Sequence, residues 1–280
     1  MSTAVLRPFR GEDRTAVLEL VSADLLPGLP GLTFAELDQA VQGTGPSGPA
    51  VRAGLEGVCT EVLACPDGRV VGAVSWAVRS SDGTVMLLWL HCLEDEQILA
   101  RALIGRAVAR LGRRAVHAFA EPTALAPAGL AVNNRAGTRR ALEDCGFSGT
   151  DRWRYLHRRL DDRGGHLPAL ADVVECPGLP GWRLDLREWD GARIGEALVR
   201  APVEGVTALE WARLTPGRRS MGNSLLEQCL AHLADRKVRE VSTVLPAPSD
   251  DQPSLDAALA LHTAAGFTEI DQLYTFIRRP

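Results

Sequence analysis

The sequence predicts an α/β protein built from two similar halves. The same order of strands and helices occurs twice along the chain, and the second copy is the shorter one. Each copy closes with a helix, a Gly-Phe pair that begins at Gly146 or Gly266, and a final strand. Between the copies, residues 161–168 are polar and contain glycine and proline, as linkers do. We therefore expect an N-terminal domain over 1–160 and a C-terminal domain over 169–280.

In the first half, the spacing of apolar residues predicts a mixed sheet and four helices. A hairpin is expected around Pro66-Asp67-Gly68, which is a good turn signal. The expected strands are 4–9, 61–64, 70–78, 84–90, 116–120 and 153–159, and the expected helices are 14–25, 33–41, 99–111 and 134–144.

The second half starts with loops and strands and leaves no room for two helices ahead of them. One helix is expected to begin in the turn that contains Gly222, and a second covers 255–265. The expected strands are 182–189, 193–200, 209–214, 240–245 and 272–277.

The turn after strand 209–214 carries arginine and glycine ahead of a helix. The first backbone N–H groups of a helix have no partner within it, and the helix dipole attracts anions to that end. Gly222 would let a phosphate approach the backbone, and Arg219 could add charge-assisted hydrogen bonds. These features predict a pyrophosphate site, although a glycine turn before a helix is more often only a turn.

The order strand, turn, helix, strand, helix, Gly-Phe, strand resembles the Gcn5-related N-acetyltransferases (GNAT superfamily). In their motif Gln/Arg-x-x-Gly-x-Gly/Ala, the three marked places fall on Arg219, Gly222 and Ser224. The resemblance covers nearly all of the chain. It implies two tandem GNAT folds, each a mixed, mostly antiparallel twisted sheet flanked by helices, and acetyl-CoA as co-substrate. The residues expected to bind acetyl-CoA are Leu214, Arg218, Arg219, Ser220, Met221, Gly222, Asn223 and Ser224.

The resemblance implies catalysis chiefly by holding a thioester beside an amine. Glu210, on the strand leading into the turn, is the expected base, and the alternative is an ion pair with Arg213 or Arg200. His262 stands where many family members carry a tyrosine that protonates the departing thiolate. It is the expected acid, and the alternative is a polar residue on a helix face.

Two further expectations concern the sheet of the second half. Strand alternation places Glu210, Ala212 and Leu214 on one face. In GNAT enzymes the helices after the first strand usually wall the acceptor site, and the second half lacks them. We expect the first domain or a partner subunit to close this site instead.

The corresponding turn of the first half is degraded. Gln97 takes the place of Arg219, and Ala100 takes the place of Gly222, where a methyl group would crowd a phosphate. We expect this half to have a structural or substrate-shaping role. Three acidic residues that would repel a polyanion in this turn are Glu94, Asp95 and Glu96.

Bulk properties narrow the partners and the compartment. The net charge of −4 gives no reason to expect nucleic acid or an anionic membrane. The six cysteines form no C-x-x-C pair and lie at no metal-ligand spacing from histidine, so we expect free thiols and no metal. No signal segment and no run of about 20 apolar residues is evident, which favours a cytoplasmic protein. The sequence leaves a homodimer open.

The sequence therefore predicts an acetyl-CoA-dependent N-acetyltransferase. Its acceptor would be the primary amine of a small molecule, such as an amino sugar, an antibiotic or an amino acid derivative. The layout is similar to that of mycothiol synthase, which also joins two GNAT halves. The alternative is a non-catalytic protein with GNAT folds that binds or sequesters a ligand, which the departures at Ser224 and His262 favour.

Overall fold

The computed structural model describes residues 4–44, 54–160, 171–176, 181–187, 190–215, 221–247 and 254–280. The chain forms two compact units. The first unit holds Met1–Leu25, Gly31–Arg152 and Asp271–Pro280, and the second holds Leu26–Pro30 and Trp153–Ile270. These units differ from the domains expected from the sequence. The expected linker, 161–168, lies outside the described residues.

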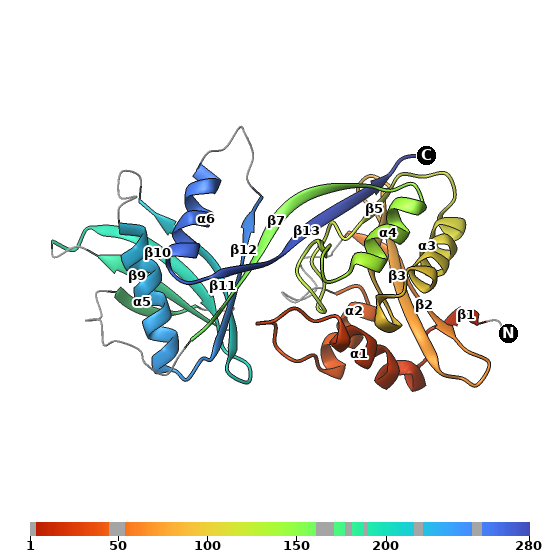
Figure 1. Ribbon diagram of the computed structural model, residues 1–280, viewed down its shortest axis with the longest axis horizontal. Coiled ribbons are helices and arrows are strands. Elements are labelled where there is room, and N and C mark those ends of the chain that lie inside the picture. Colours follow the sequence, from red (N-terminus) through yellow and green to blue (C-terminus); the bar gives the residue numbers. More distant parts are fainter. Residues whose placement is uncertain are drawn as a thin grey trace. The chain divides into compact units, whose positions relative to one another are not determined.

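The first unit is a mixed sheet with helices on both faces (Figure 1). Helices α1 (Arg14–Ala23) and α2 (Phe34–Val41) pack against one face, and α3 (Gln97–Leu111) and α4 (Ala136–Asp144) pack against the other. The strand order is β1-β2-β3-β4-β5-β13, with β6 also beside β13, and β4 and β5 are the parallel pair. The strands that lie wholly in this unit are β1 Val5–Pro8, β2 Leu55–Ala64, β3 Val70–Arg79, β4 Val85–Cys92, β5 Val116–Ala118 and β6 Leu130–Ala131. Most of β13 (Thr268–Arg278) also lies in it.

The second unit has a sheet in the order β7-β12-β11-β10-β9-β8, in which β11 and β12 are the parallel pair. Helices α5 (Gly222–Asp235) and α6 (Ser254–Ala264) pack against one face through a core that includes Leu226 and Leu233. No helix covers the other face in the part of this unit that the structure describes. The strands are β7 Ser148–Arg159, β8 Ala171–Glu175, β9 Gly181–Arg187, β10 Arg193–Arg200, β11 Val206–Leu214 and β12 Glu240–Pro246.

The two closing strands are exchanged between the copies. Strand β7 ends the first copy in sequence, yet Trp153–Arg159 pair with β12 in the second unit. Strand β13 (Thr268–Arg278) ends the second copy, yet Phe276–Arg278 pair with β5 in the first unit. The two strands have similar sequences after their Gly-Phe pairs, so each can fill the place of the other. This exchange is why the compact units do not follow the order of the chain.

The secondary structure agrees with the expected order, and the strongest local signals are visible in the contacts. Thr33 and Glu36 form a capping box at the start of α2. The carboxylate of Asp67 accepts a hydrogen bond from the backbone N–H of Arg69 at 3.0 Å in the predicted hairpin turn. The short strands β6 and β8 are the strands of the described chain that the sequence analysis did not predict.

Candidate functional site

In the second unit, the parallel strands β11 and β12 are paired only along their first parts. The register runs from Val206 opposite Glu240 to Leu209 opposite Thr243. At this last position the hydroxyl of Thr243 donates to the carbonyl of Leu209 at 2.8 Å. Strand β11 continues to Leu214 without further pairing to β12 in the described residues. The second part of β11 therefore borders a place where the sheet is not continuous.

A β-bulge lies at this point and changes the faces of β11. Leu198 of β10 is opposite Trp211, and the next residue, Val199, is opposite Leu209, so Glu210 is the extra residue. Leu209 and Ala212 consequently both face the core beneath α5. The expectation that Glu210 shares a face with Ala212 was wrong, because strict alternation ends at a bulge.

Glu210 forms an ion pair with Arg200, and its side chain is 32% exposed. Arg200 follows the core residue Val199 on β10, so this pair lies on the face of the sheet that α5 and α6 do not cover. The guanidinium of Arg213 instead lies over the ring of Trp211, 4.8 Å from its centroid. Of the two partners suggested by the sequence, Arg200 is the one that Glu210 meets. The carboxylate remains accessible to a small molecule from this face.

The start of α5 shows why a glycine is needed there. Gly222 is buried, and a Cβ at this position would lie 2.8 Å from Cδ2 of Leu261 and 3.2 Å from Cδ1 of Leu214. The close packing of α5 on α6 and β11 therefore explains Gly222, a reason that the sequence did not reveal. The N-cap residue, Met221, makes no capping hydrogen bond with its side chain.

The other residues expected at the coenzyme site have different surroundings. Leu214 and Met221 are half-buried against the core of the second unit. Asn223 is exposed and Ser224 is half-buried in the first turn of α5. The remaining three predicted residues lie outside the described part of the chain: Arg218, Arg219 and Ser220.

His262 is buried inside the second unit, with 4% of its surface exposed. Its Nδ1 lies 2.8 Å from the carbonyl oxygen of Ala258, and its ring makes an edge contact with Phe267. Burial lowers the pKa of His262 below its ordinary value. Counting back from the Gly-Phe pair, the same position in the first copy is Leu142, a fully buried core residue. These surroundings favour the alternative of a polar residue on a packed helix face over the expected general acid.

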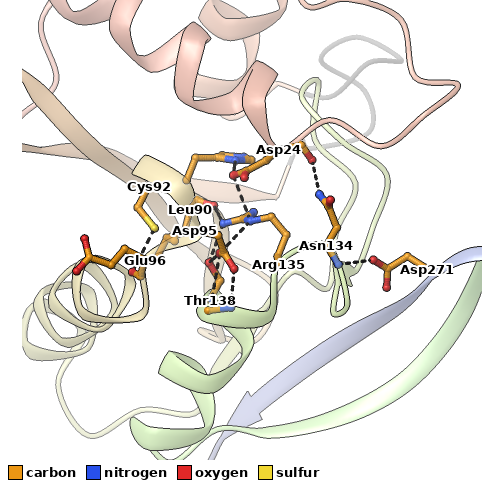
Figure 2. A network of polar contacts seen from close by, with 11 residues as sticks. Asp24, Leu90, Cys92, Asp95, Glu96, Asn134, Arg135, Thr138 and Asp271 are labelled. Carbon is orange, nitrogen blue, oxygen red and sulfur yellow. Dashed lines mark hydrogen bonds and ion pairs between the residues drawn. The ribbon is translucent and has the colours of Figure 1, made fainter.

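The first unit has the same bulge at an equivalent position but a different environment. Leu88 is the extra residue of β4, since Ser75 is opposite Trp89 and Trp76 is opposite Leu87. Beyond the bulge, Nη2 of Arg135 donates to the carbonyl of Leu90 at 2.8 Å (Figure 2). A side chain of the chain itself therefore bonds β4 where the pairing with β5 has ended.

Asp95 occupies the N-terminus of α4 in this unit. Its carboxylate accepts hydrogen bonds from the backbone N–H groups of Gly137 at 2.5 Å and Thr138 at 3.0 Å, and from the Thr138 hydroxyl (Figure 2). A Cβ at Gly137 would overlap the carbonyl oxygen of Asp95. The acidic turn was expected to repel a polyanion. Its Asp95 instead provides the negative charge at the N-terminus of α4.

Asp24 and His91 complete this polar cluster. Oδ2 of Asp24 lies 2.7 Å from Nδ1 of His91 and 3.1 Å from Nε of Arg135. Burial, followed by the charge of Arg135, lowers the pKa of His91, while Asp24 opposes this shift. Sequence reasoning missed this cluster, apart from Asp95. The available signal was a histidine at the end of an otherwise apolar strand.

Other expectations concern cysteine, metals and membranes. All six cysteines are free, as predicted. The described residues include no group of His, Cys, Asp or Glu side chains arranged to hold a metal ion. None of their helices is both long and apolar enough to cross a bilayer.

Solved structures match this architecture. A tandem GNAT protein from the clavulanic acid biosynthesis pathway, solved without acetyl-CoA, has a TM-score of 0.63 and 16% identity over 98% of each chain. The GCN5-related N-acetyltransferase from Sphaerobacter thermophilus has a TM-score of 0.60 and 15% identity, over 99% of this chain and 96% of that one. The chain has the tandem GNAT fold.

A third similar structure is a GCN5-related glucosamine N-acetyltransferase region of a fungal multi-domain β-N-acetylglucosaminidase. It has a TM-score of 0.61 and 12% identity, over 99% of this chain and 38% of that one. No protein-family model and no curated protein matches the chain. The matches to solved structures and the order of elements confirm the predicted pair of GNAT folds with a shortened second copy.

Proposed function

We propose that this tandem GNAT chain is an acetyl-CoA-dependent N-acetyltransferase that works in its second unit on the primary amine of a small molecule. The observation that carries this proposal is the contrast between the two bulged strands. In the first unit, Arg135 bonds β4 beyond the bulge and Asp95 fills the nearby helix end. In the second unit, the bulge presents a partly exposed carboxylate, Glu210, beside strands that have ceased to pair.

Each part of the second unit has a chemical task in this proposal. The turn before α5, with Arg219, would hold the pyrophosphate, and the thioester would lie along the second part of β11. Glu210 would take the proton of the ammonium form of the acceptor, directly or through water. The ion pair with Arg200 would orient that carboxylate on the face that no described helix covers. His262 has no proton-transfer role in this scheme.

The rival is a non-catalytic GNAT-fold protein that binds or sequesters a ligand. The first unit favours it in one respect, since Arg135, Asp24 and Asp95 beyond its bulge are paired with one another. The two functions differ in a measurable way. An enzyme releases CoA thiol when amine is added, whereas a sequestering protein binds without turnover.

Calorimetry with acetyl-CoA and thiol-release assays with glucosamine, kanamycin and lysine test the proposal on the full chain. We expect micromolar binding that Arg219→Glu abolishes, and turnover of at least one amine. Glu210→Gln should lower kcat/KM by about 10²–10⁴-fold. The matched control is Glu196→Gln, which removes an ion-paired carboxylate from the neighbouring strand β10. Binding without turnover of any of the three amines would favour the rival.

A further inference from the structure

The bulges of β4 and β11 allow the two units to be compared residue by residue. Leu87 precedes the extra residue of β4, and Leu209 precedes the extra residue of β11. On the parallel neighbours, Ala118 is opposite Leu87 and Thr243 is opposite Leu209. The last paired position of the parallel strands therefore carries an alanine in the first unit and a threonine in the second.

The carbonyl groups at these positions accept hydrogen bonds from different donors. In the first unit, the backbone N–H of Phe119 donates to the carbonyl of Leu87 at 3.0 Å. Phe119 has a left-handed φ of 57°, and β5 ends at the residue before it. In the second unit, the hydroxyl of Thr243 donates to the carbonyl of Leu209 at 2.8 Å. A side chain thus supplies the bond that the backbone supplies in the first unit.

This difference allows β12 to stay extended at the point where β5 ends. Beyond Thr243, β12 remains paired with β7 as far as Pro246, which is opposite Trp153. Beyond the bulge, β11 remains paired with β10 as far as Leu214, which is opposite Gly195. Each strand keeps its outer neighbour, although β11 and β12 no longer pair with one another among the described residues. The separation between the two strands is therefore supported by regular sheet on both sides.

The hydroxyl of Thr243 controls how far β11 and β12 pair. Thr243 is 3% exposed, and Leu209 beside it belongs to the core beneath α5. A buried carbonyl needs a donor, because leaving it unpaired is costly. With the hydroxyl as donor, this carbonyl is satisfied without a backbone N–H from β12. If the hydroxyl were absent, the carbonyl would be left to the next backbone donor of β12, and that bond would draw the two strands together.

We propose that Thr243 is a positioning residue for the acyl donor. Its hydroxyl ends the pairing of β11 with β12 and so keeps the second part of β11 free for a thioester. This inference rests on the proposed function, in which acetyl-CoA lies along that part of β11. The first copy lacks the threonine, and there Arg135 bonds the corresponding part of β4.

Thr243→Val tests this role, because it removes the hydroxyl and keeps the branched shape of the side chain. Thr207→Val is the matched control on β11: Thr207 is also 3% exposed, and its hydroxyl donates to the carbonyl of Arg200 at 2.7 Å. Both variants lose one hydrogen bond to a strand carbonyl, so their melting temperatures should fall by similar amounts. In calorimetry, Thr243→Val should raise the dissociation constant for acetyl-CoA at least tenfold, and Thr207→Val should change it less than twofold.

Two further substitutions at the same position complete the test. Thr243→Ser keeps the hydroxyl and should bind acetyl-CoA within threefold of the wild-type value. Thr243→Ala carries the residue of the first copy and should weaken binding at least tenfold, so it replaces the valine variant if that one does not fold. At saturating acetyl-CoA, the KM for the amine that is turned over fastest should stay within twofold in all of these variants.

The outcomes separate this inference from the proposed function. If the wild type binds acetyl-CoA and Thr243→Val or Thr243→Ala binds it equally well, the role of Thr243 is overturned and the proposed function stands. Equal weakening in Thr243→Val and Thr207→Val, or no recovery of binding in Thr243→Ser, would also overturn that role. Failure of the wild-type chain to bind acetyl-CoA would overturn both.

Discussion

Arg135 reaches from the start of α4 to the backbone of Leu90, and its Nη2 bonds the carbonyl of that strand residue at 2.8 Å. The same guanidinium lies 3.1 Å from Asp24 and 3.4 Å from Asp95. One buried cation thus joins α1, β4, the turn before α3 and α4. In the first unit, the position beyond the bulge of β4 is therefore occupied by a side chain that stabilises the fold.

Arg135→Ala should destabilise the first unit strongly. Breaking a buried ion pair by removing one partner costs about 3–5 kcal/mol, because the other charge stays buried, and here two carboxylates would be left. The matched control is Arg139→Ala, in the same helix, whose partner Glu143 and own side chain are both exposed. Chemical denaturation should show a loss of about 0–1 kcal/mol for that control. Equal losses in the two variants would refute the structural role of Arg135.

Gly137→Ala should also lower the free energy of unfolding, by about 1–3 kcal/mol or more, because the new methyl group overlaps the backbone of Asp95. Gly105→Ala provides the comparison. It lies inside α3 with nothing within 4 Å of its Cβ position, so alanine should stabilise the protein by about 0.5–1 kcal/mol. Opposite signs in thermal or chemical unfolding are the expected result, and the same sign in both would contradict the packing of Asp95 on α4.

His262→Leu tests whether the histidine moves a proton. Its burial and its correspondence to Leu142 indicate a packing role, so leucine should keep the pH–rate profile and alter kcat less than tenfold. Enzyme assays across pH 5 to 9, with the melting temperature measured alongside, distinguish the two roles. A loss of about 10² or more in kcat in a well-folded variant would restore the acid predicted from the family resemblance.

His232 of α5 should make the second unit sensitive to acid. Arg236 lies 2.9 Å from its Nδ1, and its buried Nε2 has no hydrogen-bond partner among the described residues. Burial, followed by Arg236, lowers the pKa of His232 to about 4. A neutral histidine of this kind contributes stability that is fully present above its unfolded pKa of about 6.5 and is lost as the pH falls toward 4.

Unfolding of wild type and His232→Gln, measured from pH 7 to pH 4, checks this expectation. The free energy of unfolding of the wild type should fall more steeply with acidification than that of the variant. A difference between the two proteins that does not change with pH would show that His232 does not titrate on unfolding.

The order of elements could be predicted because it rests on local signals. Thr33 and Glu36 are three residues apart, and their capping box marks the start of α2 through neighbouring residues alone. The polar cluster of the first unit could not, because it joins residues that are distant in sequence. His91 and Asp24 are separated by 67 positions, and Arg135 and Leu90 by 45. No local pattern indicates which side chain will meet which.

The candidate site shows the same limit. Glu210 was placed on the correct strand, but a bulge depends on how the neighbouring strand pairs, so its face was wrong. Gly222 was recognised as important for the approach of a ligand, whereas Leu261, far along the chain, accounts for it. The exchange of the closing strands could not be predicted either, because two similar closing sequences permit it without determining it.

That exchange bears on how the protein is made. A ribosome produces β5 early, but the strand that covers its edge, β13, comes only after the whole second copy. Until then the edge offers unpaired backbone groups to any neighbouring chain, which invites aggregation. Each copy lacks the closing strand of its own sheet, which the other copy provides. The smallest unit that can fold completely is therefore the pair of copies.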